Sequence, residues 1–168
     1  MKENIKNGLK YLPILIIVLI IIILSKGNED KKLLEENAKE NQTNDIIFPS
    51  LLPNKENISM KKMLGKKYVL QFFATWCGYC MEEYDAFLKM ETKIPVYGIL
   101  WRDEIENGRE LLKIKANPFV NIGVDPYGSI SQVFNISVIP QTFVIDEEGK
   151  IIFHRVGAFD VKYLLKFF

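Results

Sequence analysis

The sequence predicts an α/β fold in which helices cover a mixed β-sheet. Three observations support this prediction. A continuous β-prone run at 68–74 has the composition of a strand buried on both faces. Strand-like and helix-like segments alternate after that run. Two strand-like segments joined by a short turn then form a hairpin pattern near the end of the chain. A strand–helix–strand unit followed by a hairpin requires parallel and antiparallel pairing in one sheet.

The expected elements begin at Ile46 and follow the hydrophobic pattern of the chain. A helix is expected from Gly78 to about Thr92, where apolar residues recur near helical spacing. Pro126 suits the first turn of a later helix, and Asp160 suits the cap of the last one. After the first strand and helix, we expect a strand at 96–101, a helix at 104–115, a strand at 120–124, a helix at 126–134, a hairpin of 142–146 and 151–155, and a helix ending at 168.

Composition limits the classes of function. A chain of 168 residues suits one domain and an appendage. Its net charge of +1, from 22 basic and 21 acidic side chains, gives no field for gripping a phosphate backbone, so no nucleic acid partner is expected. One histidine and two cysteines are too few for a structural zinc site, which takes about four such ligands. We expect no metal and no cofactor.

The N-terminal region contains an unbroken apolar run from Leu12 to Leu24. A helix of about fifteen residues spans roughly 22 Å, which is short of the ~30 Å hydrocarbon core of a bilayer. Snorkelling of Lys10 and Lys26, or local thinning of the bilayer, closes the gap. No small-x-small cleavage site follows, so an uncleaved signal anchor is expected. A cleaved signal peptide and a buried helix are the alternatives.

These features divide the chain into four parts. They are a cytoplasmic N-terminus at 1–10, a transmembrane signal anchor at 11–25, a charged linker at 26–45 and a folded domain at 46–168. The density of charged and Asn residues in the linker favours a disordered tether, with a charged helix as the alternative. Lysines lie on both sides of the apolar run, so the positive-inside bias is weak and the orientation depends on the redox chemistry below.

The segment Ala-Thr-Trp-Cys-Gly-Tyr-Cys at 74–80 lies where the buried strand ends and a helix begins. At the N-terminus of a helix, free N–H groups and the helix dipole stabilise a thiolate at Cys77 and lower the pKa of this nucleophile. Cys80 lies one turn later on the same face and can attack a mixed disulfide to release the product. Trp76 is expected to cover the site. A redox-active disulfide, Cys77–Cys80, is the favoured interpretation.

Three other interpretations of the cysteine pair are weaker. A fortuitous pair of cysteines does not explain why the two lie where a buried strand ends and a helix begins. Half of a metal site lacks the remaining ligands. A haem attachment motif needs His after the second cysteine, and Met81 stands there.

Several segments of the chain together resemble a known family. Tyr68 to Cys80, with Ile-Pro-Gln-Thr at 139–142, resembles the thioredoxin superfamily. From about Phe48 to about Asp160 the chain more narrowly resembles the membrane-anchored thiol:disulfide interchange proteins of cytochrome c maturation, the CcmG/DsbE family. The further matching segments are 48–52, 64–67, 97–99, 101–103, 117–119, 125–128 and 140–146, with Gly149.

The resemblance implies a thioredoxin-like mixed sheet flanked by helices and preceded by a single N-terminal transmembrane helix. It implies that Pro140 is a cis-proline facing the cysteines, the alternative being an ordinary trans proline. The backbone at Ile139, Pro140 and Gln141 would then bind an extended substrate peptide by strand addition. The family usually has Glu where Gln141 stands, so a strongly acidic groove is not expected.

Four further polar residues, at 71, 83, 103 and 154, have an expected place or role in this fold. Gln71 stands where thioredoxin keeps a buried Asp. Glu83 matches an acid of the family's groove and would shuttle the proton that Cys80 loses; an exposed helix glutamate is the alternative. Asp103 matches a second acid near the groove, with the same alternative. His154 is expected to be a polar residue of the hairpin surface rather than a catalytic group.

By resemblance, the function is that of a reductant for the haem-binding cysteine pair of apocytochrome c, or for a cytochrome c maturation protein that holds it. The protein would be a monomer on the periplasmic side of the inner membrane, and a membrane thiol reductase would supply its electrons. The Gly78–Tyr79 dipeptide instead resembles periplasmic disulfide isomerases, so a broader isomerase or reductase is an alternative. A non-catalytic module that binds apocytochrome is another.

Overall fold

The computed structural model describes residues 45–168 of the chain. The expected cytoplasmic N-terminus, signal anchor and nearly all of the charged linker lie outside the described residues. Within the described part, no helix is both long enough and apolar enough to cross a bilayer.

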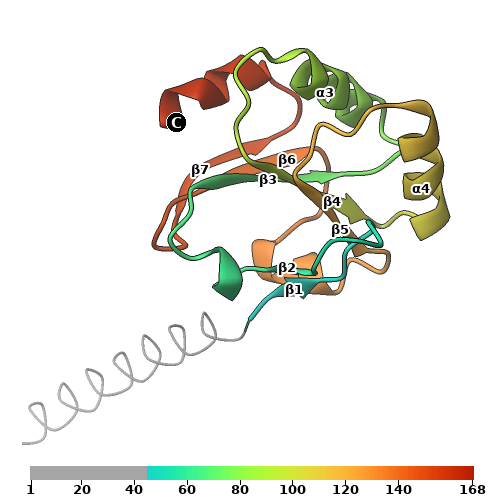
Figure 1. Cartoon of the computed structure of the whole chain (residues 1–168), viewed down its shortest axis with the longest axis horizontal. Coiled ribbons are helices and arrows are strands. Elements are labelled where there is room, and N and C mark those ends of the chain that lie inside the picture. Colours follow the sequence, from blue (N-terminus) through green and yellow to red (C-terminus); the bar gives the residue numbers. More distant parts are fainter. Residues whose placement is uncertain (1–44) are drawn as a thin grey trace, which may run out of the picture. The chain divides into compact units, whose positions relative to one another are not determined.

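A five-stranded mixed sheet forms the centre of the fold, in the strand order β5-β4-β3-β6-β7 (Figure 1). The central strand β3 pairs in parallel with β4, and β4 pairs in parallel with β5. On its other side β3 pairs antiparallel with β6, which forms the hairpin with β7. The strands are β3 (Tyr68–Phe73), β4 (Val96–Trp101), β5 (Asn121–Asp125), β6 (Gln141–Ile145) and β7 (Ile151–Val156). The predicted mixed sheet is therefore confirmed.

Helices and a small ribbon cover the two faces of the sheet (Figure 1). One face packs against α3 (Gly78–Lys89), α4 (Ile105–Ile114) and the 3-10 helix η3 (Val161–Phe167), through buried residues such as Tyr84, Leu111 and Leu164. The other face packs Phe72 and Phe143 against Phe48 in β1 (Ile47–Phe48), together with Ile58 of β2 (Ile58–Ser59) and part of the 3-10 helix η2 (Ile130–Phe134). A shorter 3-10 helix, η1 (Lys61–Met63), follows β2.

Several element boundaries differ from the sequence predictions. The helix expected at 126–134 begins only at Ile130, because Asp125–Gly128 forms a turn with the Gly128 N–H bonded to the Asp125 carbonyl at 3.1 Å. This helix and the last one are 3-10 rather than α. Helix α3 ends at Lys89, because Met90 is extended. Asp160 caps η3 as expected, since its carboxylate accepts the Lys162 N–H at 3.0 Å.

The two edge strands of the sheet differ in how far they are covered. The chain before β2 runs along β5, where the Leu51 N–H donates to the Ile122 carbonyl at 2.7 Å and the Val124 N–H donates to the Pro49 carbonyl at 2.8 Å. The approach is close at Gly123, where an added Cβ would lie 2.6 Å from the Phe48 Cβ. Strand β7 forms the opposite edge, and most of its side chains are exposed.

Strand direction places three loops at one end of the sheet. Because β3, β4 and β5 are parallel, the loops that leave their carboxyl ends lie along the same edge. These loops carry Thr75–Cys77, Arg102–Asp103 and Pro126–Gly128. The candidate site is built at this end.

Candidate active site

Cys77 and Cys80 form a disulfide at the start of α3. Cys77 is the N-cap residue, and its Sγ accepts the Cys80 backbone N–H at 3.2 Å. Donors of this kind stabilise negative charge on sulfur at a helix N-terminus. Cys77 is 8% exposed, whereas Cys80 is 1% exposed. An incoming sulfur therefore reaches Cys77 before Cys80.

The loop before β6 lies against the cysteine pair. Its Ile139–Pro140 peptide bond is cis. The Ile139 carbonyl oxygen lies 4.0 Å from the Cys77 Sγ. Within residues 45–168 the Ile139 N–H has no hydrogen-bond partner. An extended peptide at this edge thus finds free backbone groups next to the reactive sulfur.

Gln141 directly follows this loop, and its side chain is buried in the fold. Its amide nitrogen donates to the Val138 carbonyl at 2.9 Å, and its amide oxygen lies 2.8 Å from the His154 Nε2. The His154 ring stacks on Phe143, with ring centroids 4.2 Å apart and an interplanar angle of 6°. His154 is exposed on the hairpin, as predicted, and through Gln141 its ring also supports the loop.

Glu83 belongs to α3 and is buried against the rest of the fold, with 3% of its surface exposed. Its Oε2 accepts the Gln71 amide N–H at 2.5 Å, and its Oε1 accepts the Phe159 backbone N–H at 3.0 Å. The Gln71 carbonyl oxygen in turn accepts the Thr142 hydroxyl. The alternative of an exposed helix glutamate is wrong.

Burial changes the acidity of Glu83. Loss of solvation raises the pKa of this carboxyl from 4.5 to about 7, although the hydrogen bonds from Phe159 and Gln71 and the charge of Arg155 partly oppose the rise. Cys80 and Glu83 are three residues apart on α3 and so share one face of the helix. A carboxyl with a pKa near neutrality therefore lies one turn from the more buried cysteine.

Asp103 is buried and holds the loop that precedes Cys77. Its Oδ2 accepts both the N–H and the hydroxyl of Thr75, each at 2.6 Å. Its Oδ1 accepts the Glu104 N–H and the Asn107 side-chain amide, each at 2.8 Å. The alternative of an exposed acid is wrong here too. With both oxygens occupied, the carboxylate joins the Thr75–Cys77 loop to the start of α4.

Removing this carboxylate is expected to loosen the loop. Asp103→Ala leaves four donors without their acceptor, and we expect a loss of about 2–4 kcal/mol in the free energy of unfolding. Urea titration of the full chain measures this loss. Glu104→Ala is the matched control, because Glu104 is the exposed neighbour. Equal stabilities for the two variants would contradict the anchoring role.

Exposed aromatic side chains flank Cys77. Trp76 is 60% exposed and Tyr79 is 67% exposed. The Trp76 indole N–H donates to the Arg102 carbonyl at 3.1 Å, which links the ring to the loop after β4. Arg102 adopts φ 47°, and its guanidinium lies 4.7 Å from the centre of the Trp101 ring. This surface offers apolar contact to a bound partner.

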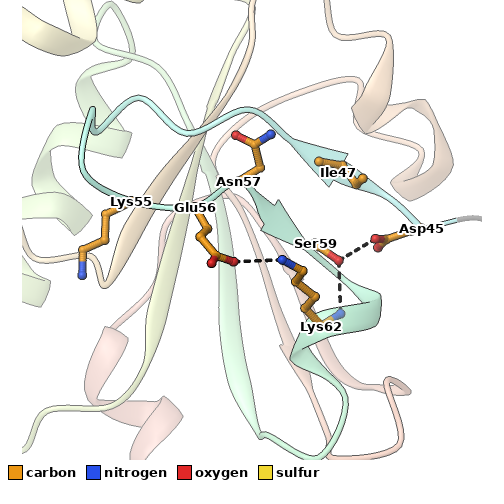
Figure 2. A pocket seen from close by; sticks show the side chains of 7 residues that line it. All are labelled: Asp45, Ile47, Lys55, Glu56, Asn57, Ser59 and Lys62. Atoms are coloured by element: carbon orange, nitrogen blue, oxygen red, sulfur yellow. Dashed lines mark hydrogen bonds and ion pairs between the residues drawn. The ribbon is translucent and has the colours of Figure 1, made fainter.

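An open hollow lies away from these residues, beside β1 and β2 (Figure 2). Asp45 accepts the Ser59 hydroxyl at 2.6 Å and the Lys61 N–H at 3.0 Å, and Lys62 pairs with Glu56 at 2.9 Å. The polar groups of the hollow thus largely satisfy one another. The hollow contains none of the predicted site residues. Its lining residues are Asp45, Ile47, Lys55, Glu56, Asn57, Ser59 and Lys62.

Sequence reasoning missed the supporting residues Thr75, Thr142 and Phe159. Thr142 could have been found from the sequence, because it follows Pro140 by two residues in an expected strand. Its pairing with Gln71 across β3 and β6 depends on the register of the sheet. The Phe159 N–H reaches Glu83 from 76 residues away, and no local pattern indicates that contact.

Fold and site together define a class of protein. A cysteine pair that opens the helix after the central strand of such a mixed sheet, with a cis-proline loop against it, is the arrangement of a thioredoxin-like thiol:disulfide oxidoreductase. The model of the AhpC/TSA family matches residues 40–154. The chain belongs to this family.

Comparison with individual proteins agrees with this class. The chain is 22% identical over 157 residues to the "Probable thiol:disulfide interchange protein DsbE-2" of Pasteurella multocida, covering 93% of this chain and 84% of the relative. It is 30% identical to the DsbE homolog of Paracoccus denitrificans, covering 66% of this chain and 63% of the relative. The match spans about half the length of several other such relatives. A thioredoxin family protein of Chlorobium tepidum has the same fold, with a TM-score of 0.60 and 22% identity over 73% of this chain and 92% of that one.

Proposed function

We propose that this protein is a membrane-anchored reductant of exported proteins, acting on the haem-binding cysteine pair of apocytochrome c or on a maturation partner that holds it. The observation that carries the proposal is the Cys77–Cys80 pair set against the Ile139 carbonyl. The resemblance to the CcmG/DsbE family from about Phe48 to about Asp160, and relatives named DsbE, support the choice of substrate.

The proposed reaction is thiol–disulfide exchange in two steps. In the dithiol form, the Cys77 thiolate attacks a substrate disulfide and forms a mixed disulfide. The Cys80 thiolate then attacks the Cys77 Sγ, so the substrate leaves as a dithiol and the Cys77–Cys80 disulfide forms. Two electrons pass to the substrate. The disulfide seen in the structure corresponds to the product state of the enzyme, and a membrane thiol reductase restores the dithiol.

The polar groups around the cysteines have separate parts in this reaction. Cys80 must lose its proton before it attacks, and Glu83 is the acceptor one turn away, with a pKa of about 7. The substrate lies extended along Ile139 and pairs with its free backbone groups. Trp76 and Tyr79 contact the residues that flank the substrate disulfide.

The anchor at 11–25 and the tether at 26–45 hold the domain on the periplasmic side of the inner membrane. Tethering raises the effective concentration of the dithiol near membrane-bound assembly machinery. Haem attachment needs free thiols in a compartment that oxidises them, so a local reductant has a defined task there. Protease protection of intact cells and spheroplasts tests this topology: the domain should be cleaved only after the outer barrier is opened.

The substrate assignment predicts a preference. The reduced full chain should reduce an oxidised Cys-x-x-Cys-His peptide at least about tenfold faster than a peptide with its two cysteines further apart, because a bound, aligned disulfide gains the advantage of orientation. Stopped-flow measurement of both rates checks this. The chain should also leave a scrambled multi-disulfide protein largely unrescued. Efficient rescue, with no preference between the peptides, would favour the isomerase that the Gly78–Tyr79 dipeptide suggests.

A further inference from the structure

We propose that His154 positions the substrate-binding loop Val138–Pro140, acting through the buried amide of Gln141. His154 is the single histidine of the chain. It lies on the edge strand β7, far in sequence from the cysteines. The inference rests on the proposed exchange reaction with extended substrates, because the loop matters only if a peptide binds along it.

Two consecutive hydrogen bonds connect the histidine to the loop. The His154 Nε2 lies 2.8 Å from the Gln141 Oε1, and the Gln141 Nε2 donates to the Val138 carbonyl at 2.9 Å. The His154 ring is held in place by stacking on Phe143, its partner across the β6–β7 ladder. The amide of Gln141 is therefore fixed at both ends. It connects β7 to Val138, so the position of the Val138 carbonyl depends on that of β7.

The bonding pattern determines which ring nitrogen carries a proton. The Gln141 nitrogen faces the Val138 carbonyl, so its oxygen faces the histidine. An amide oxygen only accepts, and the His154 Nε2 must therefore be protonated. Both the neutral Nε2–H tautomer and the imidazolium meet this need.

Strand β7 holds the loop at a second point. The Gly157 N–H, just after the strand, donates to the Pro140 carbonyl at 2.9 Å. The two attachments, at Val138 and Pro140, stand on either side of Ile139. Ile139 is the residue whose carbonyl lies 4.0 Å from the Cys77 Sγ. Fixing both neighbours fixes the backbone edge along which the substrate pairs.

This arrangement separates two kinds of substrate. An extended peptide needs the backbone of Ile139 at a defined place relative to Cys77. A small disulfide such as glutathione disulfide needs only access to the sulfur. Loosening the loop is expected to weaken peptide binding and to leave the reaction with the small disulfide unchanged.

His154→Phe tests this role in the full chain, because phenylalanine keeps the stack on Phe143 and removes the N–H donor. The buried Gln141 oxygen then lacks its partner. We expect KM for reduction of insulin and of an oxidised Cys-x-x-Cys-His peptide to rise about tenfold, with kcat within about twofold, given the cost of an unpaired buried acceptor. The rate with glutathione disulfide and the reduction potential should not change.

Two further variants make the result specific. His154→Gln offers an amide donor of similar reach and should restore most of the wild-type KM. Ile152→Thr alters an exposed neighbour on the same strand and should behave as wild type. An unchanged KM in His154→Phe would overturn the inference, as would parallel losses with peptide and glutathione disulfide, or failure of His154→Gln to restore binding. If the wild type shows no preference for the Cys-x-x-Cys-His peptide, the cytochrome assignment fails, while the insulin KM still decides the role of His154.

Discussion

Replacing Cys77 with serine is expected to abolish disulfide reduction, whereas replacing Cys80 with alanine should leave the first step intact and stop the second. Cys77 is the more exposed sulfur and accepts a helix N–H, so it is the attacking group. In Cys80→Ala no second thiol can release the partner, because the chain has two cysteines only. The mixed disulfide should therefore accumulate at Cys77.

Capture from cells measures this outcome. A tagged Cys80→Ala chain, quenched with acid and alkylated, should yield adducts on a non-reducing gel that disappear on reduction. The Cys77→Ser, Cys80→Ala double variant is the matched control, since it has no sulfur to form them. Absence of any cysteine-containing partner would contradict the exchange mechanism. A Cys77→Ser, Cys80→Ser chain that still supported cytochrome c assembly would instead favour the binding module.

Glu83→Gln is expected to change both the pH dependence of stability and the rate of reduction. In the folded protein, burial raises the pKa of Glu83 from 4.5 to about 7. The protonated carboxyl thus favours the fold below pH 4.5, and this contribution is lost as the pH rises through 7. Over that window the wild type should lose about 3 kcal/mol, and Glu83→Gln should not.

The structure allows this substitution. In the variant an amide NH2 group faces Gln71, which can turn its own amide so that its oxygen accepts; the Thr142 hydroxyl then accepts in place of donating. The fold should remain intact, while the proton acceptor for Cys80 is gone. Peptide reduction at pH 7 should therefore fall by about 100-fold.

Urea titrations at pH 4, 7 and 9 and single-turnover kinetics measure the two effects. Glu82→Gln is the matched control, because Glu82 is the exposed neighbour on the same helix. If Glu82→Gln and Glu83→Gln gave the same pH profile of stability, the buried, raised pKa would be wrong. If Glu83→Gln kept the wild-type rate, Glu83 would be a structural acid and Cys80 would lose its proton to water.

The predictable part of this fold is the part with a strong local signal. The run at 68–74 is β-prone and apolar except for Gln71, and this composition is expected because β3 is buried on both faces. The spacing of the two cysteines is visible in the sequence, and it predicts where α3 begins. By contrast, β1 and β2 have two residues each, which is too short for an alternating pattern. A 3-10 helix such as η2 or η3 also has no periodicity that distinguishes it from an α-helix over so few residues.

The sequence identifies the site residues more readily than it predicts what surrounds each of them in the fold. Glu83 and Glu82 are adjacent and alike in sequence, yet only Glu83 is enclosed, by Gln71 from β3 and Phe159 from the far end of the chain. Asp103 similarly becomes an anchor through Thr75, 28 residues away. His154 joins the loop of Pro140 only because β6 and β7 pair in one register. Such contacts depend on tertiary packing, which a single sequence does not display.

The reduction potential of the Cys77/Cys80 pair tests the proposed direction of electron flow most directly. The full chain would be equilibrated with glutathione redox buffers, and the fraction of reduced cysteines measured after acid quenching and alkylation. A reductant requires a potential at or below roughly −200 mV, toward that of thioredoxin. A value near roughly −120 mV, that of a strong oxidant, would contradict the proposed function and leave only the fold in common with the reductants.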